Sequence, residues 1–218
     1  MFSTVTLRGF IVRALKPKFR LLAADGHSPR LVLDIGIAND SYRECKAVFP
    51  NCTYHGLDFL QSDVELDRGD KFLLRNLEVP GALASLEHTY DAIIVNHVLE
   101  HLVRGPEVFD ELCGILAPGG RLYVEVPSIR TAYRAKTRWN YHFHDDPTHK
   151  RFYRLEDLAN AAIRNVCSVV SCGPVSTPLK DLLSLPRASL SLARGRAWGP
   201  YLLHLQRKID HILVQRMS

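Results

Sequence analysis

The sequence predicts an α/β fold in which a mostly parallel sheet is covered by helices on both faces. Short apolar segments alternate with amphipathic helical segments along the chain, which is typical of parallel strands joined by crossover helices. The 218 residues suit one α/β domain with a modest addition. The 46% hydrophobic and 23% charged residues are ordinary for a globular protein.

Seven apolar segments are predicted to form strands. They are short, bounded by turn residues and rich in branched side chains, as strands buried on both faces are. They comprise residues 31–35, 54–58, 72–77, 90–96, 121–127, 166–172 and 211–217. The segment 59–70, between the second and third strands, is short and acidic, so we expect no full crossover helix there.

Helices are predicted between these strands from periodicity and capping signals. Ser41 and Glu44 have capping-box spacing, and Pro106 suits the first turn of a helix. The predicted helical ranges are 5–24 with a break near Pro17, 41–49, 106–116 and 155–163. Pro118-Gly119-Gly120 predicts a tight turn, and residues 128–150 have no clear period and read as a loop.

We expect one domain over residues 1–218. Its parts are an N-terminal helical segment (1–28), a core (29–177), a helical insert or lid (178–209) and a last strand (210–218). The insert is leucine-rich and basic, so a lid, a homodimer face and a peripheral contact with anionic lipid are all open, the first two being favoured.

Charge and cysteine content exclude several classes of protein. The net charge of +5 is spread along the chain rather than clustered, so no nucleic-acid partner is expected. The five cysteines form no C-x-x-C pair, which favours a reducing, cytoplasmic compartment. No apolar run is long enough to span a membrane, and the first 19 residues lack the apolar core of a signal peptide.

Candidate binding residues follow the strands, because ligands of open α/β sheets bind at the carboxyl ends of the strands. Gly36 and Ala38 are small enough to let backbone approach a ligand closely. Asp58 lies 22 residues beyond Gly36, near the spacing at which an acidic residue meets ribose hydroxyls. Each residue alone also fits a plain turn, so the interpretation depends on their joint spacing.

The first loop distinguishes between cofactor classes. It has one glycine in Gly36-x-Ala38-x-x-Ser41, where a dinucleotide site usually has three. Asp34 would place a negative charge near phosphates, which is unfavourable, whereas a cationic ligand would be attracted to that charge. S-adenosylmethionine, with an ammonium, a sulfonium and no phosphate, therefore fits better than a nicotinamide dinucleotide.

Five segments resemble the Rossmann-like, S-adenosylmethionine-dependent methyltransferases, in particular the type 11 and type 23 methyltransferase domains. They are VLDIGIAND (32–40), YHGLDF (54–59), YDAIIVNHVLEHL (90–102), LAPGGRLYVEVP (116–127) and THKRFYRLEDL (148–158). The resemblance implies a doubly wound, seven-stranded sheet whose last strand is antiparallel. The family commonly has G-C-G-x-G in the first loop, and this chain departs from that pattern at residues 36–40.

The same resemblance implies a position for each cofactor-binding residue. Asp34 and Gly36, together with Asn96 and His97, would lie near the methionine end, and Asp58 would bind the ribose hydroxyls. Phe59, Asn76 and Leu77 would contact the adenine.

Candidate general bases are histidines, in the order His149, His144 and His97, since imidazole titrates near neutrality. An alternative hypothesis is that the loop 142–149 binds a metal ion, because it holds three histidines and two aspartates. Metal-dependent relatives place acidic ligands at strand ends where this chain has Asn96 and Pro127, so no metal is expected. Glu100 and His101 either line the site or form a solvated helix start.

These observations predict an S-adenosylmethionine-dependent methyltransferase acting on a small-molecule, sugar or lipid-linked acceptor at oxygen or nitrogen. The alternative is a non-catalytic scaffold of the same fold, motivated by the altered first loop. An NAD-dependent oxidoreductase is disfavoured by the missing glycines.

Overall fold

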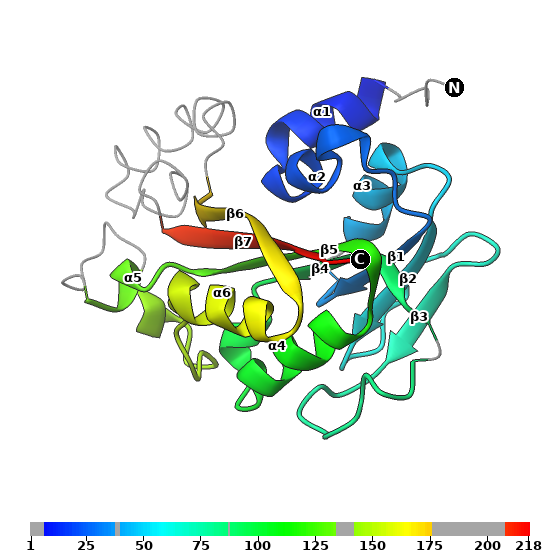
Figure 1. Ribbon diagram of the computed structural model, residues 1–218. Coiled ribbons are helices and arrows are strands. Elements are labelled where there is room, and N and C mark those ends of the chain that lie inside the picture. The colour runs from blue at the N-terminus through cyan, green and yellow to red at the C-terminus, as the bar shows by residue number, and fades with distance from the viewer. Residues whose placement is uncertain (1–6, 38–39, 87, 134–141, 176–207) are drawn as a thin grey trace, which may run out of the picture.

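The computed structural model describes residues 7–37, 40–86, 88–133, 142–175 and 208–218 (Figure 1). The helices are α1 (Leu7–Leu15), α2 (Pro17–Leu22), α3 (Ser41–Val48), α4 (Gly105–Gly114), α5 (Arg130–Tyr133) and α6 (Leu155–Arg164), with short 3-10 turns η1 (Ala24–Gly26), η2 (Leu99–His101) and η3 (Phe143–Asp145). The strands are β1 (Leu31–Ile35), β2 (Thr53–Asp58), β3 (Lys71–Leu74), β4 (Tyr90–Asn96), β5 (Leu116–Pro127), β6 (Cys167–Pro174) and β7 (Ile209–Arg216).

Within the described part of the chain, seven strands form one sheet in the order β3-β2-β1-β4-β5-β7-β6. Neighbouring strands from β3 to β5 are parallel, and β7 runs antiparallel to both β5 and β6. The predicted α/β class and the antiparallel last strand are thus confirmed. Strand order reverses between β1 and β4, which is where such sheets bind ligands.

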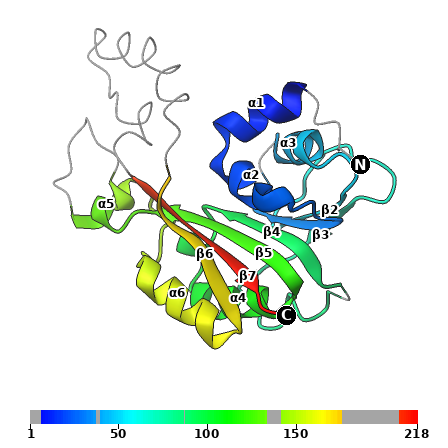
Figure 2. The same ribbon diagram turned by 45° about the horizontal axis from the view of Figure 1, so that its top comes forward.

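Helices cover both faces of the sheet, as predicted. Helices α1 to α3 lie on one face, and α4 and α6 lie on the other (Figures 1 and 2). Side chains alternate between these layers along β1, since Val32 belongs to the apolar cluster under α2 and α3. Leu33 and Ile35 belong to the cluster under α4 and α6. This alternation follows from the two-residue period of a strand.

Several boundaries differ from the prediction. The third strand ends at Leu74 rather than at residue 77, and the fifth begins at Leu116 rather than at 121. The fifth strand is longer because Leu116 pairs with Tyr90 across a register shift, so the Pro-Gly-Gly turn is absorbed into the strand. The loop predicted for 128–150 contains the short helices α5 and η3. Residues 59–70 contain no helix, as expected.

The helix predicted at Ser41 does begin there, but without the expected capping box. Asp40 occupies the N-cap position and its side chain caps nothing. The Ser41 hydroxyl instead donates a 2.5 Å hydrogen bond to the carboxylate of Asp34. A buried carboxylate requires donors, and this need takes the hydroxyl away from the helix end.

Most of the predicted insert, residues 178–209, lies outside the described residues. No helix in the described ranges is long and apolar enough to cross a membrane.

Candidate functional site

A cleft of about 720 Å³ opens where β1, β2 and β4 end. Six of the predicted binding residues line it: Gly36, Asp58, Phe59, Asn76, Leu77 and His97. Other lining residues come from η2 and the residues that flank it, and from the segment before α6, namely Val98, His101, Leu102, Pro147, Thr148 and Lys150. The carboxyl ends of the strands therefore meet in one cavity, as the sequence predicts.

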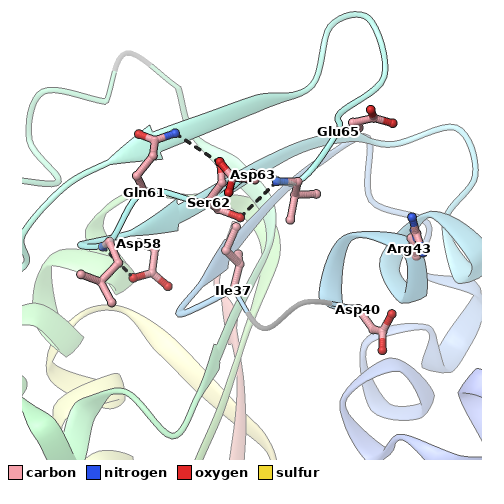
Figure 3. Close-up of a pocket in the computed structure, with 10 residues that line it drawn as sticks. Ile37, Asp40, Arg43, Asp58, Gln61, Ser62, Asp63 and Glu65 are labelled. Atoms are coloured by element: carbon pink, nitrogen blue, oxygen red, sulfur yellow. Dashed lines mark hydrogen bonds between the residues drawn. The ribbon is translucent and has the colours of Figure 1, made fainter.

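Asp58 is the last residue of β2 and lies between two cavities. It lines the cleft and also a second hollow of about 690 Å³. Figure 3 shows Asp58 on one side of that hollow and Asp40 and Arg43 on the other. Its Oδ1 accepts a 3.0 Å hydrogen bond from the Leu60 amide, which orients the carboxylate at the strand end. A carboxylate held in this way is a good acceptor for vicinal hydroxyls.

Gly36 turns the chain out of β1 with φ of +72°. A Cβ at this position would lie 2.5 Å from Cγ2 of Val98, a residue just beyond the end of β4. Both the left-handed backbone and the contact with Val98 therefore require glycine. Ala38, two residues further on, lies outside the described residues.

Asp34 does not line the cleft. It is 1% exposed and points into the layer of α3, where it accepts hydrogen bonds from the hydroxyls of Ser41 and Tyr54. Burial raises the pKa of this carboxyl despite those donors and the nearby Lys18. The sequence predicts that Asp34 contacts the ligand, whereas the structure places its side chain away from the cleft. Asp34 instead fixes the start of α3 beneath the first loop.

Asn96 and His97 end β4 beside the cleft. The side-chain oxygen of Asn96 is buried and has no hydrogen-bond partner among the described residues. His97 has φ of +53°, an unusual conformation for a residue with a side chain, and its Nδ1 lies 3.1 Å from Oε1 of Glu100. Asn96 is not among the residues that line the cleft, whereas the half-exposed imidazole of His97 is.

Among the three candidate bases, all of them described, only His97 lines the cleft. His149 is largely buried, with Nδ1 2.7 Å from the carbonyl oxygen of Phe143. His144 is exposed and its amide donates to His142. The geometry therefore favours His97, which the sequence alone ranked last of the three.

Two acidic residues lie in or next to this cleft, Glu78, which the sequence does not single out, and Glu100, whose role the sequence leaves open. Glu100 is completely buried, so η2 is not a solvated helix start at that residue. Glu78 lines the cleft and binds the amides of Val103 and Arg104 and the ammonium of Lys150. Those donors, led by the Val103 amide, lower the pKa of the Glu78 carboxyl. No periodic signal marks either residue, because their partners lie far away in the sequence.

A family model for the methyltransferase domain, type 23, matches residues 7–171. A search of curated protein sequences gives no significant match.

Solved structures with the same fold are numerous but distant in sequence. One is 1,6-didemethyltoxoflavin-N1-methyltransferase from Burkholderia thailandensis, with bound 1,6-didemethyltoxoflavin and S-adenosylhomocysteine (TM-score 0.58, 14% identity, covering 94% of this chain and 79% of that one). Another is an S-adenosylmethionine-dependent methyltransferase from Archaeoglobus fulgidus (0.59, 17%, 96% and 94%). A third is the [4+2]-cyclase SpnF (0.57, 15%, 93% and 81%). At these identities the likeness establishes the fold.

Proposed function

The chain belongs to the methyltransferase domain family, and from this premise we propose that it is an enzyme that uses S-adenosylmethionine to methylate a small-molecule acceptor. One observation carries the proposal. Gly36, Asp58, Phe59, Leu77 and His97, which the family resemblance assigns to cofactor binding, line a single cleft at the switch point of the sheet.

The lining residues provide for each part of the cofactor. Asp58 would accept hydrogen bonds from both ribose hydroxyls, and Phe59 and Leu77 would flank the adenine, with Asn76 at its edge. His97, just beyond the end of β4, would lie beside the methionine end. Asp34 would act only indirectly, by holding the start of α3 under the first loop.

When bound, S-adenosylmethionine supplies a methyl group on a good leaving group, so the protein mainly aligns donor and acceptor. The acceptor would enter beside His97, His101 and Lys150, which line the rest of the cleft. His97 is our preferred base if the acceptor is a hydroxyl, because it is the candidate histidine that reaches the cleft. His149 and His144 would act, if at all, by ordering the loop.

Titration calorimetry with S-adenosylhomocysteine tests the cofactor site. We expect Asp58→Asn to weaken binding by roughly 10- to 100-fold, because the loss of charge-assisted hydrogen bonds costs about 1.5–3 kcal/mol. Asp157→Asn, on the exposed surface of α6, is the matched control and should bind as the unaltered protein does. An unchanged dissociation constant in folded Asp58→Asn would contradict the ribose assignment.

A non-catalytic scaffold is the second candidate. It is favoured by the first loop, where Asp40 stands in place of a glycine that the family pattern commonly has. The scaffold predicts no binding of S-adenosylhomocysteine at millimolar concentration by folded protein, whereas the enzyme predicts clear binding.

A cytoplasmic location, and a lid, dimer face or lipid contact for residues 179–208, remain proposals. Flotation with anionic vesicles would test the lipid contact, and no association with the vesicles would reject it.

A further inference from the structure

We propose that Glu100, His101 and His149 form a binding site for a divalent transition-metal ion at the edge of the cleft. One carboxylate oxygen and one nitrogen of each imidazole lie within 4.8 Å of one another. Glu100 and His101 belong to η2, and His149 comes from the segment before α6. The amides of Lys150 and Arg151 bind the carbonyl of Glu100 at 2.8 and 3.2 Å, which fixes the two segments together.

The carboxylate of Glu100 is the first reason to expect a cation. The residue is 0% exposed, and its Oε2 has no hydrogen-bond partner among the described residues. Its Oε1 lies 3.1 Å from Nδ1 of His97. A buried carboxylate with an unsatisfied oxygen is costly, and a metal ion would satisfy it.

The hydrogen bonds of the two histidines are the second reason. Nδ1 of His149 faces the carbonyl of Phe143 at 2.7 Å, and because a carbonyl only accepts, Nδ1 carries the proton. The Thr148 hydroxyl donates to Asp146 at 2.5 Å, so Nδ1 of His101, 2.8 Å from that hydroxyl, must be a donor as well. Each neutral imidazole therefore keeps its lone pair on Nε2, with the other nitrogen held as in known metal sites.

This donor set determines the class of ion. Two imidazoles and one carboxylate suit Zn²⁺ and related transition metals, whereas Mg²⁺ and Ca²⁺ prefer oxygen ligands. Ligand atoms around zinc at about 2.1 Å lie roughly 3.4 Å apart, so atoms that now lie up to 4.8 Å apart need to approach by up to about 1.4 Å. Three protein ligands leave a coordination position open.

The role of the ion rests on the proposed function. His101 and Thr148 line the cleft, so the open position would take an oxygen of the acceptor. A bound ion would lower the pKa of a coordinated hydroxyl, so that its proton would leave to water and His97 would not be needed as the base. The oxygen then bonds to the methyl carbon as the carbon–sulfur bond breaks, with its electron pair remaining on sulfur. An oxygen acceptor is thereby favoured over an amine.

Metal titration of the chelator-stripped full chain tests the site. Calorimetry with Zn²⁺ should give one site, with Mg²⁺ binding at least 100-fold more weakly, and bound Co²⁺ should show the visible absorption of a low-coordinate ion. His101→Ala and His149→Ala should each weaken Zn²⁺ binding about 100-fold or more. Glu100→Gln keeps the shape and should also weaken it. His88→Ala, an exposed histidine before β4, is the matched control.

Two results would overturn the site: no stoichiometric Zn²⁺ binding by folded protein, or equal binding by His101→Ala and His88→Ala. Acetohydroxamate, a chelating oxygen ligand, should shift the Co²⁺ spectrum, and an unchanged spectrum would reject the open position. Binding of S-adenosylhomocysteine is measured on the same samples. Its loss with the metal site intact would reject the proposed function alone, and the reverse would reject the metal site alone.

Discussion

Two residues at the rim of the cleft have a left-handed backbone, Gly36 with φ of +72° and His97 with φ of +53°. The first is predictable, because a glycine after a buried strand marks a turn of this kind. The second is not, because histidine adopts positive φ more often than most residues but still rarely, so the residue type alone does not predict it. Its conformation is fixed by contacts with η2 and β5, including the bond from its amide to the carbonyl of Glu125.

Gly36→Ala should destabilise the fold by more than left-handed strain alone. Gly26 has nearly the same φ, +73°, and a Cβ there meets nothing within 4 Å. Gly26→Ala should therefore cost about 1–2 kcal/mol. Gly36→Ala should cost about 1–3 kcal/mol more, because its Cβ overlaps Val98. Urea denaturation measures both losses of stability. Equal losses would show that the Val98 side chain can move away at no cost in free energy. Adding Val98→Ala should recover most of the difference.

The side chain of Asp34 shows where single-residue reasoning failed. Its position at the end of β1 is readable from the apolar run, and its neighbours Leu33 and Ile35 face α4 and α6. Strand alternation then directs Asp34 to the opposite layer. What the sequence does not provide is its partners, Ser41 and Tyr54, because they depend on how α3 and β2 pack.

At the scale of elements, Asp70 joins α3 to the strands just before β3 begins. Its side chain is 3% exposed and accepts from the Tyr54 amide at 2.7 Å, the Tyr42 hydroxyl at 2.8 Å and the ammonium of Lys46 at 2.9 Å. Burial alone would raise the pKa of this carboxyl, but these donors together lower it.

Stability should therefore fall in acid through Asp70. A folded pKa below the unfolded value of about 3.9 gives stability that is present above that value and is lost as the pH falls through the folded pKa. Asp70→Asn should destabilise the protein by about 1–3 kcal/mol at pH 7 and reduce this acid-dependent loss. Urea unfolding at pH 7 and at pH 3 measures the effect. Asp63→Asn, which is exposed, should behave like the unaltered protein.

Element types were predictable and several boundaries were not. Periodicity identifies a strand but not its hydrogen-bond partners, so the pairing of Leu116 with Tyr90 that lengthens β5 has no sequence signal. Periodicity likewise does not predict the contact between η2 and the segment that holds His149. Their meeting depends on backbone bonds between residues about fifty positions apart.

At the scale of the whole molecule, ligand binding should raise thermal stability. Saturation at about 100 times the dissociation constant contributes about 2.7 kcal/mol, which for roughly 200 residues raises the melting temperature by about 5–10 °C. Thermal unfolding with S-adenosylhomocysteine should show this rise, and NADH should leave the transition unchanged. A rise with NADH alone would point to the dinucleotide alternative instead.

The alternation of strands and helices predicts a doubly wound sheet, and the antiparallel last strand follows from the family resemblance. Composition and periodicity do not predict where that strand inserts, because β7 joins the sheet between β5 and β6. Register across those strands is set by pairing partners such as Tyr123 with Leu213, which are ninety residues apart in the sequence.

The position of β7 between β5 and β6 also constrains the order in which the sheet can form during synthesis. A nascent polypeptide leaves the ribosome in sequence order, and β6 emerges before the strand that separates it from β5. The first five strands can dock as they appear, whereas β6 has no neighbour to pair with until β7 follows. In the interval its backbone groups are open to other molecules, so translational pausing between these two strands would expose a site of misassembly.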